Sequence, residues 1–271
     1  MIAPGRGQSP EMVPFAVHRP RTFMQILCDG FTATNITSLD LLLAEIFRLR
    51  REFPGHQVVA TLDDLQQACY TSGHGTAAHD LDSTAGHDLT GLDPKAFTDG
   101  EHLGYLSTTS EFPIRYSNLA RLAAACALPD LQNKLFWDEQ GADNDLVSIN
   151  RLPDQALQLH LEEAVLFQLV PGADPGGPIA AFPNGYFASD LSPIENFALA
   201  CHLHTEYGFR LFGIGSRFLG FDRDEGLSVE AATALSRDLI SIYEDVPRQV
   251  LSELAQTLTG RQTVFIRYTE S

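Results

Sequence analysis

The sequence has little positive charge and no long apolar run. Its 271 residues include 18 Lys and Arg against 35 Asp and Glu, a formal net charge of −17 at pH 7. A chain with this charge repels a phosphate backbone, so we expect no nucleic-acid partner. Every apolar run is far shorter than the roughly 20 residues of a membrane helix, so no membrane partner is expected either. With 44% hydrophobic residues, the chain can still build a core, and a soluble protein is predicted.

Closely spaced cysteines and a signal peptide are also absent. Cys28, Cys69, Cys126 and Cys201 form no C-x-x-C pair, which is typical of free thiols in a reducing compartment, and we therefore expect a cytoplasmic protein. Residues 1–21 contain four prolines and lack the apolar run of a signal peptide. They are interpreted as a flexible N-terminal segment.

Residues 22–271 carry the signals of a single α+β domain with a mixed β-sheet flanked by helices. In the first half, strands are predicted over 22–29 and 56–62, with a helix between them that starts after Ser38 and ends before Pro54-Gly55. The segment 153–170 shows both strand-like and helix-like periods, and its length favours a helix.

The second half shows a similar order of elements. Ser192 and Glu195 form a capping-box pattern that predicts a helix ending at Gly208, followed by extended chain over 209–222. The halves 22–130 and 145–271 both run through a strand, an acidic turn, a Ser-capped helix, a Gly stop and a strand. This likeness is loose, and the alternative is that chance produced it.

Between the first helices lies a polar stretch, residues 71–104, which is rich in Gly, Asp, Thr, His and Ala and is predicted to be an inserted loop. It contains "GHGTAAHDLDSTAGHD" at 73–88. Imidazole and carboxylate side chains there make a candidate metal site, for which we name His74, His79, His87 and Asp80. The spacing matches no established metal motif, so a solvated loop is the alternative.

A second candidate site lies around the turn that precedes the helix starting at 193. Asn184-Gly185 predicts a hairpin turn, and aromatic side chains follow it directly. Tyr186, Ser189 and Arg217 are named as candidate ligand-binding residues, although Asp190 disfavours an anionic ligand. The glycines of "GIGSRFLG" (213–220) match neither a dinucleotide fingerprint nor a nucleophile elbow, which favours a bulge or a close backbone approach.

The sequence therefore favours a binding or regulatory module without catalytic activity. The expected partner is a protein, with a basic one favoured by the acidic, aromatic-bearing surface. The alternatives are a metal-assisted hydrolase that uses segment 73–88 and a small-ligand sensor that uses the turn at 184–195 with Arg217. The sequence identifies no cofactor.

Overall fold

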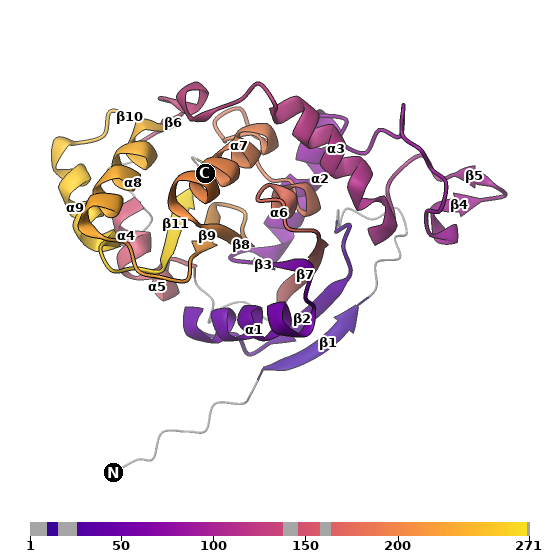
Figure 1. Ribbon diagram of the computed structural model, residues 1–271, viewed down its shortest axis with the longest axis horizontal. Coiled ribbons are helices and arrows are strands. Elements are labelled where there is room, and N and C mark those ends of the chain that lie inside the picture. The colour runs from indigo at the N-terminus through magenta and orange to yellow at the C-terminus, as the bar shows by residue number, and fades with distance from the viewer. Residues whose placement is uncertain (1–9, 16–25, 138–145, 158–163, 270–271) are drawn as a thin grey trace, which may run out of the picture.

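The computed structural model describes residues 10–15, 26–137, 146–157 and 164–269. These residues form an α+β fold built on one mixed sheet, with strand order β1-β2-β7-β3-β8-β9-β11 (Figure 1). All neighbouring strands are antiparallel except β3 and β8, which are parallel. The predicted class and mixed sheet are confirmed. The strands of this sheet are β1 (Glu11–Phe15), β2 (Gly30–Thr34), β3 (His56–Thr61), β7 (Val165–Pro171), β8 (Arg210–Ile214), β9 (Phe218–Asp222) and β11 (Thr263–Arg267).

Helices cover both faces of the sheet. Along β3, Val58 and Ala60 pack into one hydrophobic cluster with α1, whereas Val59 packs into another cluster with α6 and α7. This alternation follows from the period of two in a strand. In Figure 1, α1 accordingly lies on the opposite side of β3 from α6 and α7. The longer helices are α1 (Leu39–Glu52), α2 (Leu65–Ala78), α3 (Phe112–Ala123), α7 (Pro193–Tyr207), α8 (Val229–Ser241) and α9 (Arg248–Leu258); the shorter ones are α4 (Leu146–Arg151), α5 (Pro153–Leu157) and α6 (Gly177–Ala181).

Several helix starts are where the sequence places them. Ser38 accepts a hydrogen bond from the amide of Leu41 at the start of α1. At the start of α7, the Ser192 and Glu195 side chains each accept from the other's backbone amide, which completes the predicted capping box. Gly208 ends α7 in a left-handed conformation. These helix ends are predicted correctly because their sequence signals reflect the bonding of backbone groups that a helix leaves unpaired.

The helix predicted over 153–170 is wrong in its second part. Residues 153–157 are helical, 158–163 lie outside the described part of the chain, and β7 is a strand at the centre of the sheet. Both of its sides are paired, with β2 on one and β3 on the other. A strand buried on both faces is a continuous apolar run, which periodicity alone does not distinguish from a buried helix.

The N-terminal predictions also need correction. Residues 11–15 form the edge strand β1 on β2, so part of the segment interpreted as flexible is ordered, while 1–9 and 16–21 lie outside the described residues. Pro14 is tolerated because β1 has a neighbour on one side only. The strand predicted over 22–29 is also displaced, because the structure has β2 at 30–34 instead. Residues 26–29 are not in a strand, and 22–25 lie outside the described residues.

The polar stretch at 71–104 is not a loop throughout. Residues 71–78 are the second half of α2, and a short hairpin follows with β4 (Phe97–Thr98) and β5 (Glu101–His102). A further parallel pair, β6 (Leu135–Phe136) and β10 (Tyr243–Glu244), lies outside the main sheet. The two halves of the chain contribute strands to the same sheet, and in the described residues no strand directly precedes α7 as β2 precedes α1.

Candidate binding surface

The parallel strands β3 and β8 end at the same edge of the sheet. Their registered pairs are Ala60 with Gly213 and Thr61 with Ile214. Asp63 follows β3, and the turn Gly215–Arg217 follows β8 and leads into β9. The carboxyl ends of parallel strands are where open α/β sheets commonly form binding sites. Functional side chains are therefore expected at this edge.

Asp63 joins the two strand ends. Its carboxylate is buried and accepts hydrogen bonds from the backbone amides of Ser216 and Arg217, the latter at 3.0 Å, while Arg217 Nε lies 3.7 Å away. Burial raises the pKa of Asp63, and the two amides and Arg217 oppose this rise. A Cβ atom on Gly215 would overlap the Asp63 carboxylate, so only glycine fits there. The close backbone approach expected for this glycine-rich segment is confirmed, and a bulge lies between Leu211 and Gly213.

Tyr268 links this turn to the loop that precedes α7. Its hydroxyl donates to the carbonyl oxygens of Gly215 at 2.7 Å and Ser216 at 3.0 Å. Its own amide donates to the Arg217 carbonyl, and its carbonyl accepts from the Leu191 amide at 2.9 Å. Complete burial raises the pKa of Tyr268 well above its usual value, so the hydroxyl stays a donor.

The loop 182–192 is held by buried amide side chains. Asn196 Nδ2 donates to the carbonyls of Asn184 and Leu191, each at 3.0 Å. The Thr71 hydroxyl of α2 donates to Asn184 Oδ1. Gly75 lets α2 approach this loop closely, because a Cβ there would lie 3.2 Å from Pro193 Cγ. The loop and α2 therefore form one packed unit, and no strands flank Asn184-Gly185 as the predicted hairpin required.

Four aromatic rings form a continuous row on the outside of this unit. Tyr70 and His74 lie one turn apart on α2, with ring centroids 4.3 Å apart. His74 stacks on Tyr186 of the loop at 4.7 Å and an interplanar angle of 29°, and Tyr186 contacts Phe187 at 5.4 Å. Tyr70, Tyr186 and Phe187 are each 42% exposed. We call these four residues the aromatic strip.

Asp190 fixes the loop end of the strip. Its Oδ2 accepts hydrogen bonds from the amides of Tyr186 at 3.2 Å and Phe187 at 3.0 Å. The carboxylate thus occupies the backbone donors to which an anion would bind. This arrangement presents the rings of Tyr186 and Phe187 to solvent on a constrained backbone.

The four predicted metal ligands are not brought together. His74 is part of the aromatic strip, His79 follows the end of α2, and the exposed Asp80 has a positive φ of 50°. His87 Nε2 lies 3.0 Å from Asn118 Oδ1. Within the described part of the chain, no group of three or more His, Cys, Asp or Glu side chains has an arrangement that could hold a metal ion.

The predicted ligand-binding residues are linked only through other groups. Tyr186 is exposed in the strip, whereas Arg217 lies beside Asp63, with its guanidinium 5.1 Å from the Phe218 ring centroid. Ser189 is half-buried in the loop 182–192. The backbone of Tyr268 connects the two regions.

Sequence reasoning misses part of this surface. Asp63 and Asp64 are adjacent and do not face each other, so the sequence marks neither as functional, yet Asp63 is the residue that joins β3 to the 215–217 turn. Tyr70 could have been found from its spacing of four residues to His74 on a helix. The partnership of Tyr268 with Gly215 has no local signal, because 53 residues separate the two.

Comparison with known proteins finds no match, whether to family models, to curated proteins or to solved structures. Among the described helices, none has both the length and the apolar character to cross a membrane.

Proposed function

We propose that this protein is a binding module and that the aromatic strip contacts a basic segment of a partner protein. The observation that carries the proposal is the continuous row of rings, in which Tyr70, Tyr186 and Phe187 are exposed and His74 is half-buried. Exposed aromatic residues are enriched in protein interfaces and often supply most of their binding energy. Rings scattered singly over a surface would carry no such meaning.

The constrained backbone beneath the strip favours binding. Asp190 holds the amides of Tyr186 and Phe187, and Asn196 holds the loop on either side of them. A surface that is already ordered loses less conformational entropy on association than a mobile loop does. The loop thus presents its rings at a low entropic cost.

Charge favours a basic partner. The chain carries a net charge of −17, and the exposed Asp64 caps the helix from which Tyr70 and His74 project. An arginine side chain stacks on an aromatic face through its guanidinium and pairs with carboxylates through its N–H groups. The same net charge argues against a nucleic-acid partner. All four cysteines are free thiols, which supports a reducing, cytoplasmic setting.

The test is calorimetric titration with an arginine-rich peptide and, for comparison, a lysine-rich peptide of equal length and charge. We expect the arginine peptide to bind more tightly, and Tyr186→Ala combined with Phe187→Ala to weaken it by about tenfold, as expected from losing two stacking contacts. Phe136→Ala is the matched control, because Phe136 is 63% exposed and is not part of the strip. Equal affinity for the wild type and the double variant would refute the proposal.

Native partners can then be sought with the same variants. Captures from lysate at low and high salt are compared between the wild type, the double variant and the Phe136 control. A partner of the strip is lost from the double variant and retained by the control, and a charge-steered complex weakens as salt rises. Proteins captured equally by all three contradict the assignment to the strip.

A further inference from the structure

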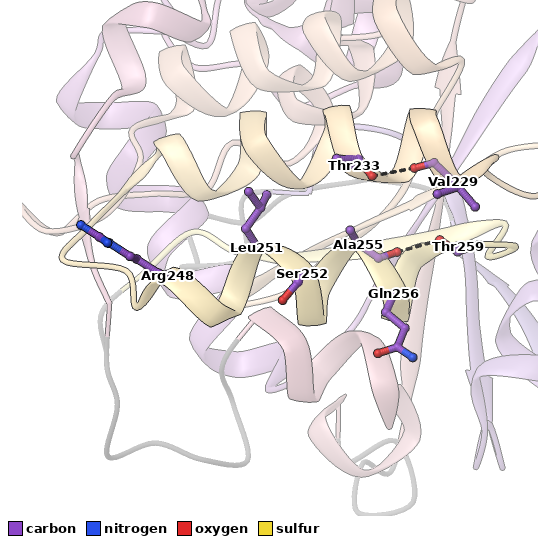
Figure 2. Close-up of a pocket in the computed structure, with 8 residues that line it drawn as sticks. All are labelled: Val229, Thr233, Arg248, Leu251, Ser252, Ala255, Gln256 and Thr259. Atoms are coloured by element: carbon purple, nitrogen blue, oxygen red, sulfur yellow. Dashed lines mark hydrogen bonds between the residues drawn. The ribbon is translucent and has the colours of Figure 1, made fainter.

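A groove of about 570 Å³ lies between α8 and α9, apart from the aromatic strip (Figure 2). Arg248 lies at one end of it, and Val229 and Thr259 lie at the other. The lining residues of α9 recur every three or four positions and so form one face of that helix. From Arg248 to Thr259 this face extends over about 16 Å, at roughly 1.5 Å per residue. The groove is therefore elongated along α9.

The hydroxyl groups in this groove already have acceptors on their own helices. Thr233 Oγ1 donates to the Val229 carbonyl at 2.7 Å, and Thr259 Oγ1 donates to the Ala255 carbonyl at 2.8 Å (Figure 2). Ser252 Oγ donates to the Gln249 carbonyl at 2.9 Å. With these hydroxyl donors occupied, Gln256 and Arg248 supply the exposed polar groups of the lining, and a ligand otherwise meets chiefly methyl and methylene groups.

Apolar side chains extend that surface. Val229 is 61% exposed, and Leu251 and Ala255 are partly exposed along the same groove. A large apolar side chain this open to water gains free energy when a ligand covers it. The end of the groove near Val229 therefore favours an apolar group.

The opposite end carries Arg248, the one charged residue among the described residues that line the groove. None of the ion pairs among the described residues includes Arg248, and the first turn of α9 holds no carboxylate. An exposed guanidinium without a partner presents several N–H donors to an anion. The two ends of the groove thus differ in the chemistry they favour.

We propose that this groove binds an anion with one long unbranched alkyl chain, such as a fatty acid, with its carboxylate at Arg248 and its tail toward Val229. The volume lies within the roughly 300–1,000 Å³ of ordinary small-molecule sites. Arg248 complements the charge of the ligand's carboxylate. The rest of the groove, which is mainly apolar and elongated, suits its alkyl chain. The site is independent of the aromatic strip.

The first test is calorimetric titration of the full chain with laurate below its micelle concentration. Butyrate and dodecanol serve as probes that lack the tail and the charge, respectively. We expect laurate to bind with one-to-one stoichiometry and both probes to bind at least about tenfold more weakly. Absence of laurate binding, or equal binding of all three, overturns the proposal.

Variants at the two ends make the test specific. Arg248→Ala should weaken laurate by roughly tenfold, as expected from losing a charged hydrogen bond. Arg121→Ala, which removes an exposed arginine of α3 that does not line the groove, should leave affinity unchanged. Equal affinity for wild type and Arg248→Ala, or an equal loss in both arginine variants, contradicts the assignment.

Val229→Asp tests the tail end without disturbing the fold. Val229 is exposed in the first turn of α8, where an acidic residue suits the helix dipole. The variant should keep its melting temperature and lose laurate, whereas Val229→Thr should bind nearly as well as the wild type. Sedimentation measures the remaining possibility: a dimer that Val229→Asp dissociates would make the groove a contact between two copies and overturn the ligand proposal.

Discussion

A buried carboxylate lies at each end of the β8–β9 hairpin, Asp222 at the end of β9 and Asp63, which follows β3, at the 215–217 turn, but the two have different hydrogen-bond partners. Asp222 is paired with two arginines: Arg50 donates to it through two nitrogens at 2.8 Å each, and Arg210 Nη2 donates to its Oδ2 at 2.8 Å. Asp63 is held by two backbone amides, with Arg217 no closer than 3.7 Å.

The two arrangements indicate different roles, one in stabilising the fold and one in positioning the aromatic strip. At Asp222, the ion pairs with Arg50 and Arg210 connect α1, β8 and β9. At Asp63, the carboxylate positions a turn, and Tyr268 connects that turn to the loop carrying Tyr186 and Phe187. We infer that the Asp222 end stabilises the fold and that the Asp63 end supports the aromatic strip, the surface proposed above to bind a partner.

The largest stability effect should come from Asp222→Ala. Removing one partner from a buried ion pair leaves uncompensated charge, and we expect a loss of about 3 kcal/mol in the free energy of unfolding. Asp224→Ala is the control, since that side chain is 83% exposed although Arg210 also contacts it, and it should cost less than about 0.5 kcal/mol. Urea denaturation compares the two. Similar losses would mean that Asp222 is not the anchor of this end.

Asn196→Ala should affect the other end and have the next largest effect. It leaves the carbonyls of Asn184 and Leu191 without their buried donor, which we expect to cost about 2 kcal/mol. It should also weaken binding of the arginine peptide, because the loop that carries Tyr186 becomes less ordered. Gln249→Ala, at an exposed position of α9, should change neither property. If Asn196→Ala is destabilised but binds the peptide as tightly as the wild type, the order of the loop does not contribute to peptide binding.

Because its pKa is raised, Asp63 should make the free energy of unfolding fall as pH rises, whereas an ordinary paired carboxylate makes it increase. Between its unfolded pKa of about 3.9 and its higher folded pKa, the folded state binds more protons than the unfolded state. The contribution of Asp63 to the free energy of unfolding therefore falls as pH rises through this window, by about 1.4 kcal/mol for each pH unit, and is constant above it. Asp63→Asn should remove this slope. Urea denaturation at a series of pH values gives both curves, and parallel curves would contradict the prediction.

The smallest stability effect is expected at His74. His74→Phe keeps a ring between Tyr70 and Tyr186 and should change the free energy of unfolding by less than about 0.5 kcal/mol, because the side chain is partly exposed. Peptide affinity should be retained in His74→Phe and reduced severalfold in His74→Ala. If both variants lose affinity equally, the continuity of rings is not what the peptide recognises.

The parts of the fold that the sequence predicts correctly are those with local causes. Ser38 and the Ser192–Glu195 pair identify helix starts because each satisfies nearby backbone amides. By contrast, the local pattern predicts a helix where β7 lies, because the strand character of β7 depends on β2 and β3, which lie far away in the chain. Pairing partners of this kind leave no mark in a local pattern.

The candidate surface is predictable in the same limited way. The turn identifies Tyr186 and the polar segment identifies His74, but the sequence assigns them to different sites. Their stacking depends on the close packing of α2 against the loop at Gly75 and Pro193, which no local signal indicates.

The most direct test of the strip as the recognition surface is an NMR titration of isotope-labelled protein with the arginine-rich peptide. We predict that chemical shift changes concentrate at Tyr70, His74, Tyr186 and Phe187 and saturate together, while Arg50, Arg210 and Asp222 stay unchanged. Changes spread evenly over the acidic surface, or centred on the Asp222 end, would contradict the division of roles between the two ends of the sheet.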